Sequence, residues 1–214
     1  MDIKNVSKKQ LERYPLYLKY LLSLDESHIE NVSSPMIARA LELTEEQVRK
    51  DLQIVTKKEG KPREGRKVKE LIEDLEQFLG YNEISEAIIV GVGHLGQAFM
   101  KYKGFLSFGL KVVAGFDIDP NLVGTMINEK PVYHVDKIKE IIPHLNCQIA
   151  IVTTPSDVSQ EIVNTLIESG IEAIWNFTPI HLDVPKDIVV ENVNLASSLA
   201  VLSHKLKRKN MKEI

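Results

Sequence analysis

The sequence has few of the residues that mark several common protein classes. A single cysteine, Cys147, excludes an internal disulfide and fits a reducing compartment such as the cytoplasm. No apolar run approaches the roughly 20 residues that a membrane-spanning helix needs, and residues 1–5 lack the apolar core of a secretory signal peptide. The six histidines are scattered, so no metal-binding cluster is expected. We therefore expect a cytoplasmic protein that binds neither a metal nor a membrane.

The charge is almost balanced overall but uneven along the chain. The 214 residues carry a net charge of −3, and 43% hydrophobic with 27% charged residues is ordinary for a globular protein of one large or two small domains. From Arg49 to Lys69, however, the sequence has nine basic residues and only three acidic ones. A run of like charge is usually a solvated surface. Here it joins an expected helix to a loop with glycine and proline, which favours contact with nucleic acid.

The first eighty residues show the pattern of a helix-turn-helix domain. After an apolar stripe that predicts a helix over 11–24, two serines and a proline predict the start of a short helix over 36–41. A capping box opens a second helix over 44–55. The basic loop over 57–66, with two glycines and a proline, is typical of a wing. We therefore expect a winged-helix DNA-binding domain over residues 1–80.

The second helix of such a domain would enter the major groove of DNA with its first turns. Its outward polar side chains can contact base edges and phosphates, and the basic side chains of the wing can contact phosphates. These candidates are Gln47, Arg49, Lys50, Gln53, Lys57, Lys58, Lys61 and Arg63. The alternative is a small helical bundle that packs on the second domain and carries solvated lysines.

A glycine-rich turn follows a continuous apolar run. Residues 87–90 predict a buried parallel strand, and residues 97–102 predict a helix. The G-x-G-x-x-G pattern between them supplies a tight turn, a close approach of the backbone to a diphosphate, and close packing of helix on strand. The start of the helix adds N–H groups and the positive end of the helix dipole, which together predict a Rossmann nucleotide-binding site. The candidate cofactor contacts here are Gly91, Val92, Gly93, His94, Leu95 and Gly96.

An acidic residue ends the next expected strand, which covers residues 111–117. Asp117 lies 21 residues after Gly96. A carboxylate at this place can bind the hydroxyls of a ribose and repels a 2′-phosphate. The sequence therefore predicts NAD(H) as the cofactor in preference to NADP(H).

The rest of the nucleotide-binding domain, residues 81–194, alternates strands and helices, as a parallel sheet covered on both faces requires. Strands are expected over 148–152, 171–175 and 188–190, with a helix over about 156–169. Ligands bind where such strands end, so the loops after the first two are candidates for contact with a nicotinamide. The alternative is that both loops are ordinary turns. The candidates are Thr154, Pro155, Asn176, Phe177, Thr178 and Pro179.

The C-terminal segment, residues 195–214, carries an apolar stripe. A helix over 195–209 would place four leucines on one face, and such a face has to be buried either on its own domain or on a second subunit. The basic end of this helix suits the negative pole of the helix dipole, so those charges do not require nucleic acid. The four residues are Leu195, Leu199, Leu202 and Leu206.

Motifs spread over almost the whole chain resemble the Rex family of redox-sensing transcriptional repressors. They are R-x-P at 13–15, S-S at 33–34, V-R-K-D-L at 48–52, G-V-G-x-L-G at 91–96, F-D-x-D-P at 116–120, N-F-T-P at 176–179 and V-E-N-V at 190–193. The resemblance implies a homodimer that binds operator DNA through two winged helices, that NADH but not NAD+ loosens DNA binding, and that the C-terminal helix swaps between subunits. It adds Arg13 and Ser34 to the candidate DNA contacts and Asp119 to the cofactor contacts.

The chain departs from the family pattern at several positions, among them His94, Leu122, Arg66 and Asn194. One alternative is therefore a relative that binds NAD(H) or DNA without the usual response to redox state. Another is an NAD-dependent dehydrogenase, which needs a general acid or base beside the nicotinamide, and His181 is the histidine placed for that role. Because the chain has no second domain to hold a substrate, we expect a regulator and not an enzyme.

Overall fold

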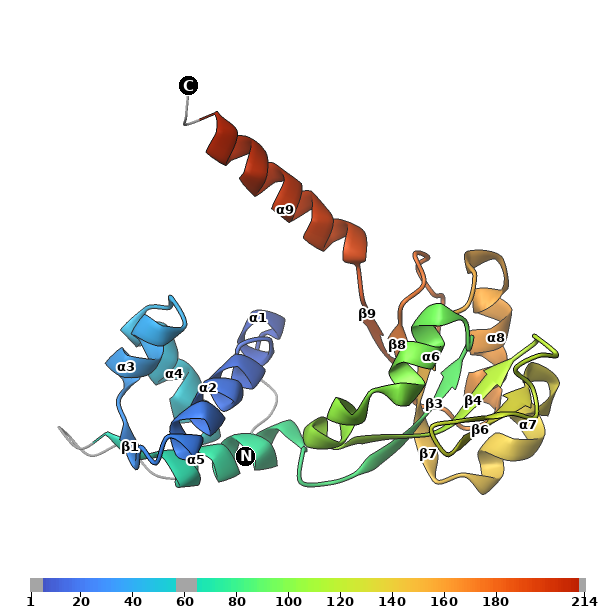
Figure 1. Cartoon of the computed structure of the whole chain (residues 1–214), viewed down its shortest axis with the longest axis horizontal. Coiled ribbons are helices and arrows are strands. Elements are labelled where there is room, and N and C mark those ends of the chain that lie inside the picture. Colours follow the sequence, from blue (N-terminus) through green and yellow to red (C-terminus); the bar gives the residue numbers. More distant parts are fainter. Residues whose placement is uncertain (1–5, 57–64, 212–214) are drawn as a thin grey trace. The chain divides into compact units, whose positions relative to one another are not determined.

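The computed structural model describes residues 6–56 and 65–211, which form two compact units (Figure 1). The first unit is Met1–Glu83 and the second is Ile84–Ile214. The chain thus divides beside the turn at residues 80–82, where the sequence predicts a domain boundary. Four candidate DNA contacts of the expected wing lie outside the described residues, namely Lys57, Lys58, Lys61 and Arg63.

The described part of the first unit combines helices with a short antiparallel sheet. Its sheet pairs the segment before the helix-turn-helix with the segment after residue 64. The second helix of the helix-turn-helix begins with the expected capping box, in which Thr44 and Gln47 each bond the other's backbone. The elements are α1 (Lys8–Leu11), α2 (Tyr14–Glu26), β1 (Asn31–Val32), α3 (Ser34–Ala40), α4 (Glu45–Val55), β2 (Arg66–Lys67) and α5 (Val68–Leu79).

One expected helix is two helices in the structure. The apolar stripe over 11–24 predicted a single element, but α1 ends at Leu11 and α2 begins at Tyr14. Pro15 lies in the first turn of α2. A proline is tolerated there because the N–H groups of the first turn have no partner within the helix. Helix α1 buries none of its residues and Leu11 is 43% exposed, so the part of the stripe that faces the core belongs to α2.

Helices α2, α4 and α5 form the core of the first unit. Tyr17 and Leu21 of α2 are fully buried, together with Leu75 of α5. Helix α4 contributes Val48 and Leu52, which belong to the face that the sequence predicted to be apolar. Burying this face leaves the opposite face of α4 exposed to solvent.

The second unit contains a seven-stranded sheet with the order β5-β6-β4-β3-β7-β8-β9 (Figure 1). Neighbouring strands are parallel except β5 and β6. Without the edge strand β5, the order is the 3-2-1-4-5-6 of a Rossmann sheet, and the order reverses between β3 and β7. The strands are β3 (Ser85–Val90), β4 (Leu110–Asp117), β5 (Met126–Ile127), β6 (Lys130–His134), β7 (Cys147–Val152), β8 (Ala173–Asn176) and β9 (Val189–Asn192).

Helices cover both faces of this sheet (Figure 1). Ile89 of β3 packs in a cluster with Met100 of α6, whereas its neighbour Ile88 packs in a second cluster with Val163 of α8. Successive residues of a buried strand point to opposite faces, so each face has its own core. The helical segments are α6 (His94–Lys101), α7 (Ile138–Ile141) and α8 (Ser156–Glu168), with 3-10 turns η2 (Lys103–Phe108), η3 (Val135–Lys137) and η4 (Ile142–His144).

Two expectations for this unit need comment. The strands β5 and β6 were not predicted, and His134 is the last residue of β6. The strand escaped notice because it is short and contains a proline. Cys147 is buried at the start of β7, and burial raises the pKa of its thiol, as is typical of an unreactive core cysteine.

Four aromatic rings gather on the α6 side of the sheet. Trp175 of β8 stacks on Phe99 of α6 with the ring centroids 6.2 Å apart, and it also contacts Phe105 and Phe177 at 5.9 and 4.9 Å. Phe99 and Phe177 touch each other at 4.8 Å. The cluster therefore joins the helix after the glycine-rich turn to the loop after β8.

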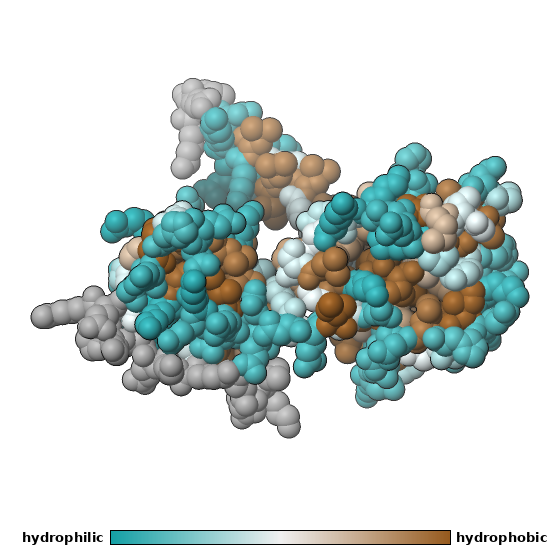
Figure 2. All heavy atoms as spheres, turned by 60° about the horizontal axis from the view of Figure 1, so that its bottom comes forward, coloured by the Kyte–Doolittle hydropathy of each residue, from teal (hydrophilic) through white to brown (hydrophobic). Residues whose placement is uncertain are grey.

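The last helix, α9 (Leu195–Asn210), has no buried residue. Its four stripe leucines, expected to be covered, are each between 58% and 65% exposed. Apolar side chains stand uncovered on this segment in Figure 2. In the described ranges of the chain, neither this helix nor any other is long and apolar enough to span a bilayer.

Candidate functional site

The glycine-rich turn connects β3 to α6, as the sequence predicts. Gly91 has a φ of +91°, and a Cβ atom there would lie 2.8 Å from the carbonyl carbon of Thr153. A Cβ atom on Gly96 would lie 2.0 Å from the carbonyl oxygen of Gly91. The fold itself therefore requires the first and third glycines, the first for its left-handed backbone and the third for the close packing of helix on turn.

Gly93 has no such role inside the protein. A Cβ atom built on it would meet nothing within 4 Å, and its φ of −67° is open to any residue. Gly93 occupies the cap position of α6, where it offers no side chain to the N–H groups of the first turn. An exposed helix start with open space above it matches the place where a Rossmann fold receives a diphosphate.

Asp117 holds the glycine-rich turn against the end of β4. Its carboxylate accepts hydrogen bonds from the backbone N–H groups of Val92, Ile118 and Asp119. Asp117, the residue predicted to bind a ribose, thus lies beside the glycine-rich turn that is predicted to bind the diphosphate. Asp119 has a more local role, because its carboxylate accepts two bonds from Asn121, both at 2.9 Å, and shapes the turn after β4.

His134 is a site residue that the sequence did not reveal. The parallel register of β4 and β6 places it opposite Asp117, at the carboxyl end of the sheet. Its Nδ1 atom accepts a bond of 3.2 Å from the backbone N–H of Asp136, and its side chain remains 40% exposed. Only the strand pairing brings it to the site, so a residue pattern could not have found it.

The loop after β7 contacts the glycine-rich turn through Thr153. The Thr153 hydroxyl donates a 2.6 Å hydrogen bond to the carbonyl oxygen of Gly91. The side chain of the predicted neighbour, Thr154, turns inward and bonds Ser159 at 2.9 Å. The Thr154 side chain is thus engaged within the protein, its contact with a nicotinamide stays a prediction, and Pro155 is exposed at the start of α8.

The loop after β8 borders a cavity of about 540 Å³. Of the four residues that the sequence chose here, three line this cavity, and Asn176 lies buried behind them. The opposite wall comes from the segment that leads from β9 into α9. The lining comprises Phe177, Thr178, Pro179, Ile180, His181, Asn192, Val193, Asn194, Leu195 and Ala196.

The exposed face of α4 displays the polar side chains that the sequence chose for DNA. Gln47, Arg49, Lys50 and Gln53 are all exposed. Two of them already have partners, since the Gln47 side-chain oxygen accepts bonds from Thr44 in the capping box and the Lys50 ammonium lies 2.7 Å from Glu46. Ser34 is half-buried at the first residue of α3.

Arg13 is placed differently from the expectation. Its guanidinium makes two bonds to the Asp51 carboxylate, at 2.7 and 2.8 Å, and Asp51 is 1% exposed on the inner face of α4. Tyr17 and Gln10 donate to the same carboxylate at 2.6 and 3.2 Å. Arg13 therefore forms an ion pair with a buried carboxylate that fastens α4 to α2, and its contact with DNA stays a prediction.

The electrostatics of this pair follow from its partners. Burial would raise the pKa of Asp51, but the hydrogen bonds from Arg13, Tyr17 and Gln10 outweigh burial and lower it. The same contacts raise the pKa of Arg13. Burial raises the pKa of Tyr14, which donates to the Asp51 backbone at 3.2 Å, to about 12. At neutral pH the pair is ionised and both tyrosines keep their protons.

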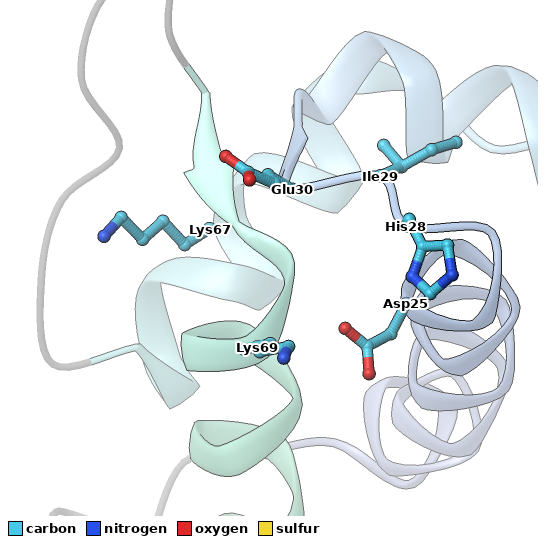
Figure 3. A pocket seen from close by; sticks show the side chains of 6 residues that line it. All are labelled: Asp25, His28, Ile29, Glu30, Lys67 and Lys69. Atoms are coloured by element: carbon cyan, nitrogen blue, oxygen red, sulfur yellow. The ribbon is translucent and has the colours of Figure 1, made fainter.

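A second hollow lies in the first unit, between the end of α2 and the start of α5 (Figure 3). Its volume is about 520 Å³, and its charged side chains have both signs. Among the residues that the structure describes, no candidate DNA contact lines it. The lining comprises Asp25, His28, Ile29, Glu30, Lys67 and Lys69.

Two family models match the chain. The family described as "CoA binding domain" matches residues 82–180, and the family described as "Putative DNA-binding protein N-terminus" matches residues 5–53. The first match covers the glycine-rich turn and the loop after β8. The second covers the helix-turn-helix almost to the end of α4.

Relatives and solved structures cover nearly the whole chain. A redox-sensing transcriptional repressor Rex from Bacteroides thetaiotaomicron is 40% identical over 206 residues, which are 96% of this chain and 93% of the relative. One of the same name from Treponema denticola is 41% identical and covers 90% of this chain and 91% of its own.

The fold is also similar to crystal structures of RSP, a Rex-family repressor. The complex of RSP with beta-NAD+ and operator DNA has a TM-score of 0.90 at 34% identity and covers 98% of this chain and 96% of that one. The complex with beta-NADH has a TM-score of 0.88 at 34% identity and covers 97% of both chains. This chain belongs to the Rex family of redox-sensing transcriptional repressors.

Proposed function

We propose that this protein is a repressor that binds operator DNA through α4 and NAD(H) at the carboxyl ends of β3, β4, β7 and β8, and that NADH lowers its affinity for DNA. The observation that carries the proposal is the combination of an open helix start at Gly93 with the Asp117 carboxylate beside it. Relatives named as redox-sensing repressors, and structures of RSP with beta-NADH, beta-NAD+ and operator DNA, support it.

The residues divide the cofactor between two halves of the sheet. The amide-rich start of α6 suits the diphosphate, and Asp117 suits a ribose with both hydroxyls free. A carboxylate at this place repels the additional phosphate of NADP(H) or of coenzyme A. His134, beside Asp117, would contact the adenosine half, and the cavity beside Phe177 would receive the nicotinamide half.

Redox sensing requires discrimination at the nicotinamide, since the rest of the cofactor is the same in both oxidation states. Oxidised nicotinamide is a cation, and the reduced ring is neutral. The described lining of the cavity offers an apolar face from Phe177 and Pro179 and a single titratable side chain, that of His181. This setting favours the neutral ring, because a cation is costly to place beside apolar surface without a carboxylate partner.

DNA binding would depend on both copies of a homodimer. Each stripe leucine of α9 would contribute about 1.5–3 kcal/mol if fully buried, and an exposed stripe of four leucines is an unfavourable surface for a monomer. We propose that α9 packs against a second copy of the chain, in the cytoplasm where operator DNA lies. Two-fold symmetry would then present two α4 helices to two half-sites.

A dehydrogenase is the other reading of a Rossmann unit. His181 lines the cavity and could serve as an acid or base. The relatives reported above are named transcriptional repressors, and we propose that this protein likewise binds NAD(H) without turning it over. Sustained oxidation of NADH with a small carbonyl compound, abolished by His181→Ala, would contradict this.

The central test measures DNA affinity against both nucleotides. A duplex is first selected from a random-sequence pool by the nucleotide-stripped protein, and its Kd is then measured with NADH, with NAD+ and with neither. We expect NADH to raise the Kd by about 5- to 150-fold, the usual range of allosteric coupling, and NAD+ to change it little. Equal effects of the two nucleotides would exclude redox sensing, and no uptake of either by calorimetry would exclude the cofactor.

A further inference from the structure

Asn176 is a polar residue with no exposed surface at the end of β8. Its side-chain oxygen accepts two bonds from Thr178, from the backbone N–H at 2.9 Å and from the hydroxyl at 2.7 Å. Its side-chain nitrogen donates to the carbonyl oxygen of Ile180 at 3.2 Å and to the side-chain oxygen of Asn192 at 2.8 Å. All the hydrogen-bonding groups of this amide are therefore engaged within the protein.

The orientation of the amide follows from its partners. The backbone N–H of Thr178 can only donate, and the carbonyl oxygen of Ile180 can only accept. The Asn176 oxygen must therefore face Thr178, and its nitrogen must face Ile180 and Asn192. Neither an aspartate nor an alanine could replace both halves of this arrangement.

These bonds connect the two walls of the cavity beside Phe177. One wall is the loop held by Thr178 and Ile180, and the other begins at Asn192. The backbone joins them too, because the N–H of Val193 donates to the carbonyl oxygen of Asn176 at 2.8 Å. Two residues after Asn192, the side chain of Asn194 caps α9 by accepting a 2.9 Å hydrogen bond from the backbone N–H of Ser197.

We propose that Asn176 and Asn192 form the link through which occupancy of this cavity reaches α9. The inference rests on the proposed function, in which the cavity receives the nicotinamide and α9 joins two subunits. A nicotinamide ring that displaces Phe177 and Thr178 also displaces the Asn176 side chain, because Thr178 donates two hydrogen bonds to it. The Asn176 amide is rigid and bonds Asn192, so Asn192 and the start of α9 move with it. Asn176 and Asn192 are positioning residues, since they act through the loop and the helix that they hold.

The test compares two substitutions of Asn192, a residue whose side chain is exposed. Asn192→Ala removes the acceptor for the Asn176 nitrogen, whereas Asn192→Asp keeps a side-chain oxygen in its place. For each variant, the Kd of the selected duplex is measured without nucleotide and with NADH at a concentration that saturates that variant. The ratio of the two Kd values reports the coupling, whatever the change in NADH affinity. Asn146→Ala, at an exposed position before β7, is the control.

We expect Asn192→Ala to reduce the ratio by roughly fivefold or more, while Asn192→Asp and Asn146→Ala keep the wild-type ratio. A wild-type ratio in Asn192→Ala would overturn the link but leave the proposed function standing. The link would also be overturned if Asn192→Asp lost as much coupling as Asn192→Ala. If the wild-type protein itself showed a ratio of one, the proposed function would fail, and the link with it.

A second variant tests the other end of the link. Asn176→Asp keeps the acceptor for Thr178 but removes both donated bonds, so coupling should fall as in Asn192→Ala. A circular dichroism melt shows whether this variant is folded. If it is not, the coupling of the double variant Thr178→Val/Asn192→Ala is measured against that of both single variants. Thr178→Val removes the hydroxyl bond to Asn176 but keeps the backbone bond. We expect the loss of coupling in the double variant to be smaller than the sum of the two single losses, because both act on one connected link, and additive losses would contradict the link.

Discussion

The two units fasten their functional elements with buried polar residues of opposite character. In the first unit, the ionised Asp51 joins α4 to Arg13 and Tyr17 of the neighbouring helical segment. In the second unit, the neutral Asn176 joins a loop to the strand that precedes α9. Removing one partner of a buried ion pair leaves an uncompensated charge, whereas removing one hydrogen-bond partner of a side-chain amide leaves only an unsatisfied dipole. The helix proposed to contact DNA is thus held by the stronger contact, and the connection proposed to move is held by the weaker one.

The largest effect should come from breaking the charged contact. Asp51→Ala leaves the Arg13 guanidinium and the Tyr17 hydroxyl without their acceptor, which should cost about 3–5 kcal/mol of unfolding free energy. Urea denaturation of the first unit measures this. The matched control is Glu46→Ala on the same helix, whose solvent-exposed pair with Lys50 should contribute little to stability. Equal losses in the two variants would abolish the contrast between a buried and an exposed pair.

Acid should reveal the same contact without mutation. The unfolded pKa of an aspartate is near 3.8, and the folded pKa of Asp51 lies below it because bonds from Arg13, Tyr17 and Gln10 outweigh burial. The contribution of the carboxylate is therefore complete above pH 3.8 and is lost as the pH falls through the folded pKa. Urea midpoints recorded at decreasing pH should fall more steeply for the wild type than for Asp51→Asn. Parallel curves would show that Asp51 has the same pKa folded and unfolded.

Gly93 and Gly96 of the glycine-rich turn allow cofactor binding to be tested separately from stability. Gly93→Ala meets no protein atom within 4 Å, so the fold should be unaffected while a methyl group occupies the space for the diphosphate. We expect the Kd for NADH to rise about tenfold or more, equivalent to roughly 1.4 kcal/mol. Gly96→Ala, which clashes with the Gly91 carbonyl, should lower the melting temperature as well. Calorimetry and thermal melts separate the two outcomes, and unchanged NADH binding in Gly93→Ala would place the diphosphate elsewhere.

Substitutions on the exposed face of α4 should change the affinity for DNA and leave the stability of the fold unchanged. Arg49→Ala and Lys50→Ala should each weaken DNA binding, and each lost phosphate contact should reduce the slope of log K against log salt by about 0.9. Lys186→Ala removes an equal charge from an exposed site of the second unit and is the control. Fluorescence anisotropy across a salt series measures both quantities. If all three variants bind DNA as the wild type does, α4 is not the DNA-contacting face.

The smallest effect is expected at the start of α9. Asn194→Ala removes the side chain that caps this helix, which should cost about 1 kcal/mol. Since α9 is proposed to join two subunits, sedimentation should show a dimer that dissociates at a higher concentration, by roughly fivefold. Ser197→Ala is the control, because Ser197 takes part in the cap through its backbone. If Asn194→Ala left the dissociation constant of the dimer unchanged, the cap would have no role in dimer formation.

The sequence was most informative where local chemistry decides the structure. Capping at Thr44 was placed correctly because it depends on Gln47, three residues away. The turn at Gly91 and the acid at the end of β4 were placed correctly because the strand–turn–helix unit of this fold has a characteristic spacing along the chain. The pairs Arg13–Asp51 and Asn176–Asn192 were not foreseen, since each joins residues distant along the chain and is made only once the units fold. His134 needed a strand pairing that its own short, proline-containing segment does not announce.

Trp175, at the centre of the aromatic cluster, can serve as an intrinsic fluorescent probe. The chain contains a single tryptophan, and that indole touches Phe177 at the edge of the proposed nicotinamide cavity. The emission of an indole overlaps the absorption of reduced nicotinamide but not that of the oxidised form. Light absorbed by Trp175 could therefore pass to bound NADH alone, so unlabelled protein would report by its own fluorescence which oxidation state it holds.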